Sequence, residues 1–455
     1  MNRRCFLRGL VSAAAGSVLA RPVLAGAARK PNIVFILADD LGYGDLGCYG
    51  QRRLKTPNLD RLSAEGVRFT QHYAGSTVCA PSRFTLMTGY HIGHAPTVGQ
   101  GQCLEPNRVT VAKCLKAAGY ATACIGKWGL GNYNTTGAAW KQGFDHFFGY
   151  LHQGHAHNYW PTFLWRNGEK VALPNVVPNE NANGMGVASR KKAYSHDLFT
   201  AEALAFVDQH KDRPFFLYLP YTIPHANNQA GNHGMEVPDQ GPFAGEDWPE
   251  QEKNFASMVW RMDRDIGRLA ERLKAHGLER HTLVLFTSDN GPHKEGGRTP
   301  AFFGSSGPLR GIKRDLYEGG IRVPAIAWWP GRIAPGRTSH HVSAFWDFLP
   351  TACEAAGAPI PAGIDGLSYL PELLGKPQRT HAYLYWKFGE QGGKQAVRSG
   401  RWKAVWLNTR KKADGRCELY DLEADVGETT NVADKHPDVV QRLTGFARQA
   451  QAPGD

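Results

Sequence analysis

The sequence predicts an α/β fold: a large mixed, mostly parallel sheet sandwiched by helices, followed by a small antiparallel sheet with one helix. Two observations lead to this prediction. Continuous apolar runs alternate with helical segments over most of the chain, which is typical of parallel strands joined by helices. From near residue 370, short strand-like runs separated by turn residues indicate an antiparallel sheet. The length of 455 residues suits a large domain with an appendage.

The large domain is expected over residues 30–370. Its expected elements, in chain order, are a strand at 32–38, helices at 57–65 and 109–118, strands at 120–125 and 215–219, a helix around 258–273 and a strand at 283–286. Three of these strands are followed by polar residues, namely Asp39-Asp40, Lys127 and Asp289-Asn290. Because ligands collect beyond the carboxyl ends of parallel strands, we expect these residues to meet in one site.

The C-terminal part is expected to form a separate α+β subdomain over residues 371–455. Its strand-like runs are short and are separated by turn residues, and a helical segment closes the chain. The expected elements are strands at 383–388, 394–398, 402–406 and 417–422 and a helix at 437–447.

Residues 1–25 are typical of an export signal. Arg3 and Arg4 precede a small, apolar run over residues 10–20, and Val23-Leu24-Ala25 suits cleavage after small residues. The paired arginines favour a twin-arginine signal, and a plain secretory signal is the alternative. Either signal predicts a periplasmic or extracellular protein. The apolar run is too short to span a bilayer and no longer one follows, so no membrane span is expected.

The formal net charge of +12 falls to +8 when the four arginines of the signal segment are removed. A basic surface favours an anionic substrate. The basic residues are scattered and accompany no nucleic-acid-binding motif, so no nucleic-acid partner is expected. Seven cysteines remain beyond the signal, and an odd number in an exported protein is a weak indication of one special thiol.

The most specific motif is Cys79-Ala80-Pro81-Ser82-Arg83, with Thr88-Gly89 downstream. Here the chain resembles the sulfatase family of the alkaline phosphatase superfamily, in which a maturation enzyme oxidises this cysteine to formylglycine. The resemblance covers nearly the whole chain beyond the signal. It implies an alkaline phosphatase-like fold, hydrolysis of sulfate esters, and a formylglycine-generating enzyme as a partner. An ordinary buried cysteine before a helix is the alternative interpretation.

The resemblance implies a metal site that the modified Cys79 completes, with four other ligands: Asp39, Asp40, Asp289 and Asn290. These four side chains offer oxygen ligands, which favour calcium, or magnesium, over zinc. Neighbouring aspartates would repel each other without a cation. Each pair, taken alone, is also compatible with a turn at the end of a strand.

The resemblance also implies catalytic roles for four further residues: Arg83, Lys127, His225 and Lys313. Arg83 and the two lysines would hold the sulfate oxygens, and His225 or Lys313 would protonate the leaving alcohol. Hydrated formylglycine carries two hydroxyls on one carbon, so one can attack sulfur and the other can later expel sulfate. The chain departs from the family at Gly129, where many members carry a histidine. His293 is a candidate substitute, and an exposed loop histidine is the alternative.

The segment 146–166 is rich in histidine, aromatic and amide side chains, which suits a loop above the site that binds a sugar. The candidate substrate-binding residues are His155, His157, Asn158, Trp160 and Arg166, together with His293. A loose resemblance of this segment to galactosamine-sulfatase-like proteins suggests a sulfated carbohydrate of the galactose or N-acetylgalactosamine type. A chelating histidine cluster and a packed insertion with structural aromatics are the alternatives.

Two other functions stay open from the sequence. A phosphodiesterase or phosphonate monoester hydrolase would use the same nucleophile. A glycan-binding pseudoenzyme would keep the fold and lose the motifs, and the Gly129 position is the one departure found here.

Overall fold

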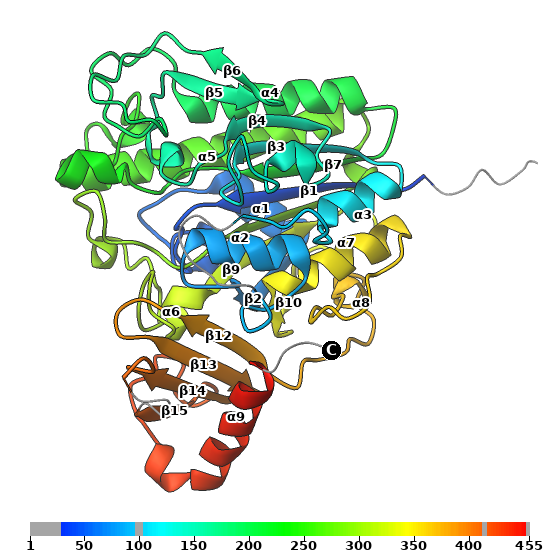
Figure 1. The fold of residues 1–455 in the computed structure, drawn as a ribbon, viewed down its shortest axis with the longest axis vertical. Coiled ribbons are helices and arrows are strands. Elements are labelled where there is room, and N and C mark those ends of the chain that lie inside the picture. Colours follow the sequence, from blue (N-terminus) through cyan, green and yellow to red (C-terminus); the bar gives the residue numbers. More distant parts are fainter. Residues whose placement is uncertain (1–28, 96–102, 412–415, 452–455) are drawn as a thin grey trace, which may run out of the picture.

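The computed structural model describes residues 29–95, 103–411 and 416–451, so the expected export signal lies outside the described residues. The described chain forms a large mixed sheet between helices and a small antiparallel sheet below it (Figure 1). The predicted fold class is thereby confirmed. Among the described helices, none combines the length and apolar character needed to cross a bilayer.

The large sheet has the strand order β10-β2-β9-β8-β1-β7-β3-β4-β5-β6, with β11 paired to β2. The central strands β8, β1, β7, β3 and β4 are parallel, whereas β9 is antiparallel to both of its neighbours and β5 and β6 form an antiparallel edge. The strands are β1 (Asn32–Ala38), β2 (Val67–Tyr73), β3 (Ala121–Lys127), β4 (His146–Tyr150), β5 (Phe163–Arg166), β6 (Glu169–Ala172), β7 (Phe215–Pro220), β8 (Thr282–Ser288), β9 (Arg322–Trp328), β10 (Arg337–Ser339) and β11 (Ser343–Ala344).

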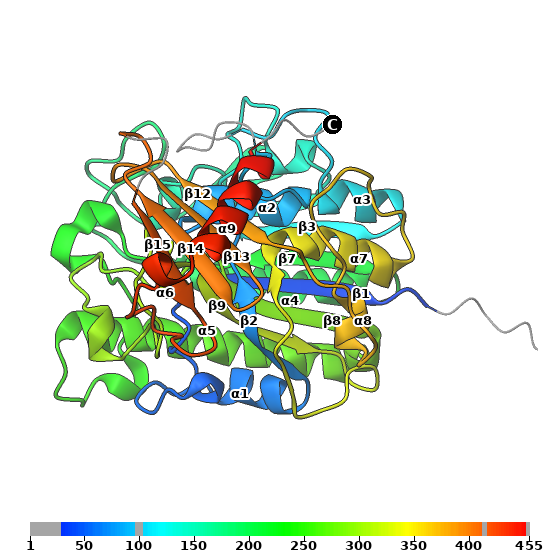
Figure 2. The same ribbon diagram turned by 90° about the horizontal axis from the view of Figure 1, so that it is seen from below.

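Helices cover both faces of this sheet (Figure 2). The helices are α1 (Pro57–Ala64), α2 (Cys79–Thr88), α3 (Val111–Ala117), α4 (Ser195–His210), α5 (Glu250–Ala275), α6 (Glu318–Ile321), α7 (Phe348–Ala356) and α8 (Leu370–Leu373). In β1, Val34 and Ile36 pack in one core with α1, α4 and α5, while Ile33 and Phe35 pack in a second core with α2, α3 and α7. Burial on both faces explains why this strand is apolar throughout.

The C-terminal sheet consists of β12 (Leu384–Phe388), β13 (Lys394–Ser399), β14 (Trp402–Leu407) and β15 (Cys417–Asp421), all antiparallel. One face packs on α9 (Pro437–Gln449), and the other packs on residues of the large domain, where Trp386 contacts Tyr73. The buried Lys403 ammonium lies 2.9 Å from both Glu318 and Glu428. This apolar and ionic contact joins the two sheets and brings the end of β12 near the site described next.

Candidate active site

The carboxyl ends of neighbouring strands bring five polar residues together at one edge of the large sheet. Asp39 and Asp40 follow β1, Lys127 ends β3, and Asp289 and Asn290 follow β8. Since β1 lies between β7 and β8, and β3 pairs with β7, these strand ends are neighbours. All five side chains are fully buried. The structure therefore gathers these five residues as the sequence predicts.

Opposite charges balance this buried cluster. Lys127 Nζ lies 2.5 Å from Asp39 Oδ2, and Arg83 Nη2 lies 2.7 Å from Asp289 Oδ2 and 3.4 Å from Asp39 Oδ2. Burial by itself raises the pKa of Asp39, but Lys127 and the other cations hold that pKa well below its ordinary value. Arg83 also donates to the Lys127 carbonyl at 2.8 Å. Its guanidinium is thus engaged in positioning Asp289.

Two oxygen atoms in the cluster have no hydrogen-bond partner among the described residues: Asp39 Oδ1 and Asn290 Oδ1. Burial, with Asp39 beside it, raises the pKa of Asp289 to about 7. Asp40 adopts a φ of 66°, which is rare outside glycine and turns its carboxylate into the cluster. Ligand atoms of Asp39, Asp40 and Cys79 lie within 4.8 Å of one another. Converging, unpaired and mutually repelling oxygens fit a hard cation such as calcium or magnesium.

Cys79 is the first residue of α2, and its side chain is buried. Burial raises the pKa of the Cys79 thiol to about 12, even though Lys127 lies close enough to oppose this. A thiol is a nucleophile only as the thiolate, so unmodified Cys79 would be nearly inert at neutral pH. The position suits a residue that acts after chemical modification.

Lys313 and His225 stand beside Asp40. Lys313 Nζ lies 2.7 Å from Asp40 Oδ2 and 3.0 Å from His225 Nε2. Burial opposes the charge of Lys313, but Asp40 raises its pKa above the ordinary value. Burial and the neighbouring Lys313 lower the pKa of His225 well below its ordinary value. The pair therefore consists of a protonated lysine and a neutral histidine.

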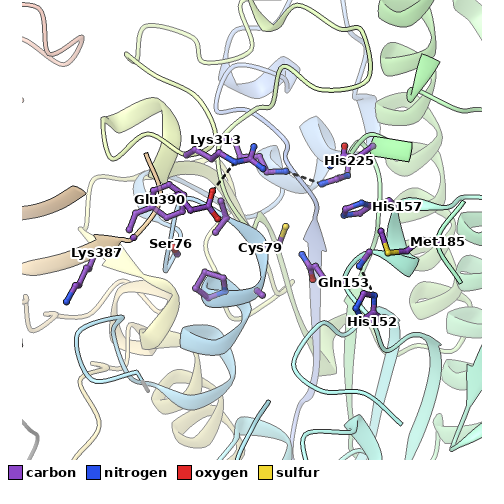
Figure 3. A pocket seen from close by; sticks show the side chains of 18 of the residues that line it. Ser76, Cys79, His152, Gln153, His157, Met185, His225, Lys313, Lys387 and Glu390 are labelled. Carbon is purple, nitrogen blue, oxygen red and sulfur yellow. Dashed lines mark hydrogen bonds and ion pairs between the residues drawn. The ribbon is translucent and has the colours of Figure 1, made fainter. Parts of the chain in front are cut away.

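A cavity of about 660 Å³ opens over Cys79 (Figure 3). It is lined by the start of α2, the loop between β4 and β5, the end of β12 with Arg410, and residues from other parts of the chain, among them Met185 and Asn228. Lys313 and His225 close its inner end, and Lys387 stands at its outer rim. The site thus joins a buried ionic cluster to a space large enough for a small organic ligand.

The chain matches two family models. One, described as "Sulfatase", covers residues 31–358, and the other, described as "N-sulphoglucosamine sulphohydrolase, C-terminal", covers residues 312–449. Human arylsulfatase A is 37% identical over 487 residues, which span 95% of this chain and 89% of that protein. The chain belongs to the sulfatase family. Sulfatases are sulfuric ester hydrolases, so the protein is an enzyme of that class.

A bacterial protein is also among the relatives. The N-acetylgalactosamine-6-O-sulfatase of Bacteroides thetaiotaomicron is 31% identical over 91% of this chain and 92% of that protein. The solved structure of Ps i-CgsB in complex with k-i-k-neocarrahexaose has a TM-score of 0.79 at 27% identity and covers 94% of each chain. The phosphonate monoester hydrolase of Agrobacterium radiobacter, with a TM-score of 0.64 at 20% identity over 92% of this chain and 96% of that chain, shares the fold.

In this sulfatase the predicted substrate loop is mostly a packed insertion. His155 packs against the rings of Tyr150 and Phe163, and Asn158 and Trp160 are buried. Arg166 is paired with Glu202. None of these four predicted substrate-binding residues (His155, Asn158, Trp160 and Arg166) is among those lining the cavity described above. These four residues are therefore not brought to the cavity, and their role in binding substrate stays a prediction.

His157 is the exception in this segment. It lines the cavity, its ring stacks on that of His225 with centroids 4.5 Å apart, and its Nδ1 has no hydrogen-bond partner among the described residues. Burial, with Lys127 nearby, lowers the pKa of His157 to about 3. His157 is therefore neutral, with one ring nitrogen that is buried and without a partner among the described residues.

His293 is buried, and both of its ring nitrogens are engaged within the fold. Nε2 donates to the Pro224 carbonyl at 3.0 Å, and Nδ1 accepts from the Glu295 amide at 3.0 Å. His293 is thus held within the fold, and its role as a substitute for the missing family histidine stays a prediction. The alternative of an exposed loop histidine is wrong.

Several cavity residues were not predicted to bind substrate. Gln153 comes from the loop between β4 and β5, Met185 from the segment between β6 and α4, and Glu390 and Arg410 from the C-terminal part. Lys387 stands beside them at the rim (Figure 3). No local motif marks these residues, because their place depends on how the small sheet packs on the large one.

Proposed function

We propose that this sulfatase removes sulfate from a sulfated carbohydrate by means of a formylglycine made from Cys79 and a bound calcium ion. The observation that carries the proposal is the place of Cys79. An intact Cys-x-Pro-Ser-Arg sequence begins α2 at the floor of a cavity, beside two buried oxygens that have no partner among the described residues.

The geometry supports a different role for each group of residues in the site. Asp39, Asp40, Asp289 and Asn290 would hold the cation. The hydrated aldehyde and the cation would supply an oxygen nucleophile whose second hydroxyl allows the later release of sulfate. Arg83 keeps Asp289 in place, while Lys127 and Lys313 place positive charge beside the sulfate oxygens.

The size and rim of the cavity favour a carbohydrate over a small aryl ester. About 660 Å³ is ample for a sulfated sugar ring, and the rim carries Lys387 and Arg410, neither of which has an acidic partner within 4 Å among the described residues. These cationic side chains suit a carbohydrate that carries further anionic groups. Relatives named for N-acetylgalactosamine sulfate, and a likeness to a structure with a neocarrahexaose, are consistent with galactose-type sugars.

We also propose that residues 1–25 direct export to the periplasm or the outside of the cell. A formylglycine-generating enzyme would oxidise Cys79 as part of its maturation. These proposals rest on the Arg3-Arg4 signal pattern and on the intact sequence around Cys79.

The test is the release of inorganic sulfate from a panel of 4-O- and 6-O-sulfated galactose and N-acetylgalactosamine mono- and disaccharides, with a phosphodiester and a phosphonate monoester as controls. The proposal expects sulfate release from at least one member at a rate well above that for the controls. Preferred hydrolysis of the phosphodiester or phosphonate would support the alternative enzyme class. Binding of the sugars without turnover by calcium-loaded, aldehyde-bearing protein would indicate a pseudoenzyme.

A further inference from the structure

Gln153 lies in the wall of the cavity that contains Cys79, on the loop between β4 and β5. In the close view its side chain extends toward Cys79 (Figure 3). Its Oε1 is shielded from solvent and has no hydrogen-bond partner among the described residues. Its Nε2, in contrast, is not one of the shielded atoms and donates no hydrogen bond to a described residue, so this end of the carboxamide can donate to a ligand in the cavity.

Gly129 makes the room that this carboxamide occupies. Gly129 lies two residues after Lys127 with a φ of 76°, and a Cβ added there would stand 2.4 Å from Gln153 Oε1. Any side chain at position 129 would therefore displace the carboxamide. Because the oxygen lies on the Gly129 side, the Nε2 amide is the end left to face the cavity.

The sulfate group of a substrate presents only hydrogen-bond acceptors, so the site needs donors. The Lys313 ammonium already contacts Asp40 at 2.7 Å, His225 at 3.0 Å and Glu295 at 3.3 Å, and Lys127 contacts Asp39 at 2.5 Å. A carboxamide adds a donor that needs no counter-charge. It can bind an anion without a neighbouring carboxylate competing for it.

We propose that Gln153 binds the sulfate group under attack, through a hydrogen bond from Nε2 to a sulfate oxygen, and that Gly129 is required to hold it there. The inference rests on the proposed function and adds two residues to its site. Gln153 and Gly129 then act as one unit, with the glycine giving access and the glutamine making the contact.

Isothermal titration of the calcium-loaded enzyme with inorganic sulfate measures this contact without relying on turnover. Gln153→Met keeps the length of the side chain and removes the hydrogen bond, so sulfate affinity should fall about tenfold. Gln395→Met makes the same change in the C-terminal sheet and should leave the affinity as it is. Sulfate binding by Gln153→Met equal to that of the unaltered protein would overturn the proposal.

Gly129→Ala tests the coupling between the two residues. The added Cβ should displace the carboxamide and weaken sulfate binding by a similar factor, and the double variant should bind no more weakly than either single one. If the loss of sulfate affinity in the double variant were the product of the two single losses, the coupling between the residues would be overturned. If the melting curve of Gly129→Ala shows that this variant does not fold, the affinity of Gln153→Met is the deciding measurement. Sulfate release by the unaltered enzyme is scored separately, so a failure of the proposed function is distinguishable from a failure of this contact.

Discussion

Lys313 donates a hydrogen bond to His225 across 3.0 Å, and the surrounding contacts fix which of the two carries the proton. His225 Nδ1 lies 2.6 Å from the Ala226 carbonyl, which can only accept, so the ring hydrogen is on Nδ1. His225 Nε2 is then an acceptor for the Lys313 ammonium. Of the two candidates for protonating the leaving alcohol, the geometry favours Lys313, with His225 orienting it.

Lys313→Ala should therefore slow the hydrolysis of sulfate esters with poor leaving groups most. A sugar alkoxide needs a proton as the ester bond breaks, whereas a nitrophenolate does not. We expect kcat on a sugar sulfate to fall by about 10²- to 10⁴-fold and kcat on nitrophenyl sulfate to fall much less. Steady-state kinetics on both substrates is the measurement. Equal losses would mean that Lys313 acts only through its charge beside the sulfate group and does not protonate the leaving alcohol.

His157 and His155 form a matched pair two residues apart in the insertion. His157→Ala should lower kcat/KM for the glycan about tenfold or more, with an unchanged melting temperature, since its ring borders the cavity. His155→Ala should lower the stability by about 1–3 kcal/mol and leave kcat/KM of the folded enzyme intact, since its ring packs between Tyr150 and Phe163. Loss of activity in His155→Ala and loss of stability in His157→Ala would instead mean that the sugar contacts His155.

Metal removal should abolish activity and lower the melting temperature. A bound cation would give a partner to Asp39 Oδ1 and Asn290 Oδ1, which have none among the described residues, and a ligand that binds only the folded state stabilises that state. Thermal melting with and without calcium after chelation measures the effect. Asn290→Ala should reduce the calcium-dependent rise, and a rise of the same size in this variant would exclude Asn290 as a ligand.

His381 should make the stability depend on pH. Burial opposes its charge, but Asp347 at 2.7 Å raises the pKa of His381 above its ordinary value. A raised histidine pKa stabilises the fold fully below the unfolded pKa and loses this effect as pH rises through the folded pKa. The difference in melting temperature between the unaltered protein and His381→Gln should be larger at about pH 6 than at about pH 9. A difference independent of pH would contradict the ion pair.

The strands and helices with a clear apolar period could be predicted from the sequence, and so could the convergence of their polar ends. β1 is apolar on both faces, and Asp39 and Asp40 follow it directly, so the position of the cluster follows from strand order. α4 was not predicted, because its buried face includes Ser195, His196 and Thr200, which interrupt the apolar stripe.

The substrate side of the site could not be predicted for a different reason. His155 and His157 have the same residue type and nearly the same position, yet one ring packs inward and the other faces the cavity. Lys387 and Arg410 reach the rim only through the packing of the small sheet, where Trp386 contacts Tyr73. Such placements depend on tertiary contacts that a one-dimensional pattern does not contain.

A modified Cys79 should be the group that removes sulfate from its ester, and turnover and modification can be measured on the same sample. Inorganic sulfate release from a sulfated galactose or N-acetylgalactosamine saccharide is followed for calcium-loaded enzyme from the native host, with the Cys79 peptide of the same sample weighed by mass spectrometry. Turnover should scale with the fraction of aldehyde at residue 79, and Cys79→Ala, although folded, should release no sulfate. Full turnover by protein that carries only unmodified cysteine would contradict this role of Cys79.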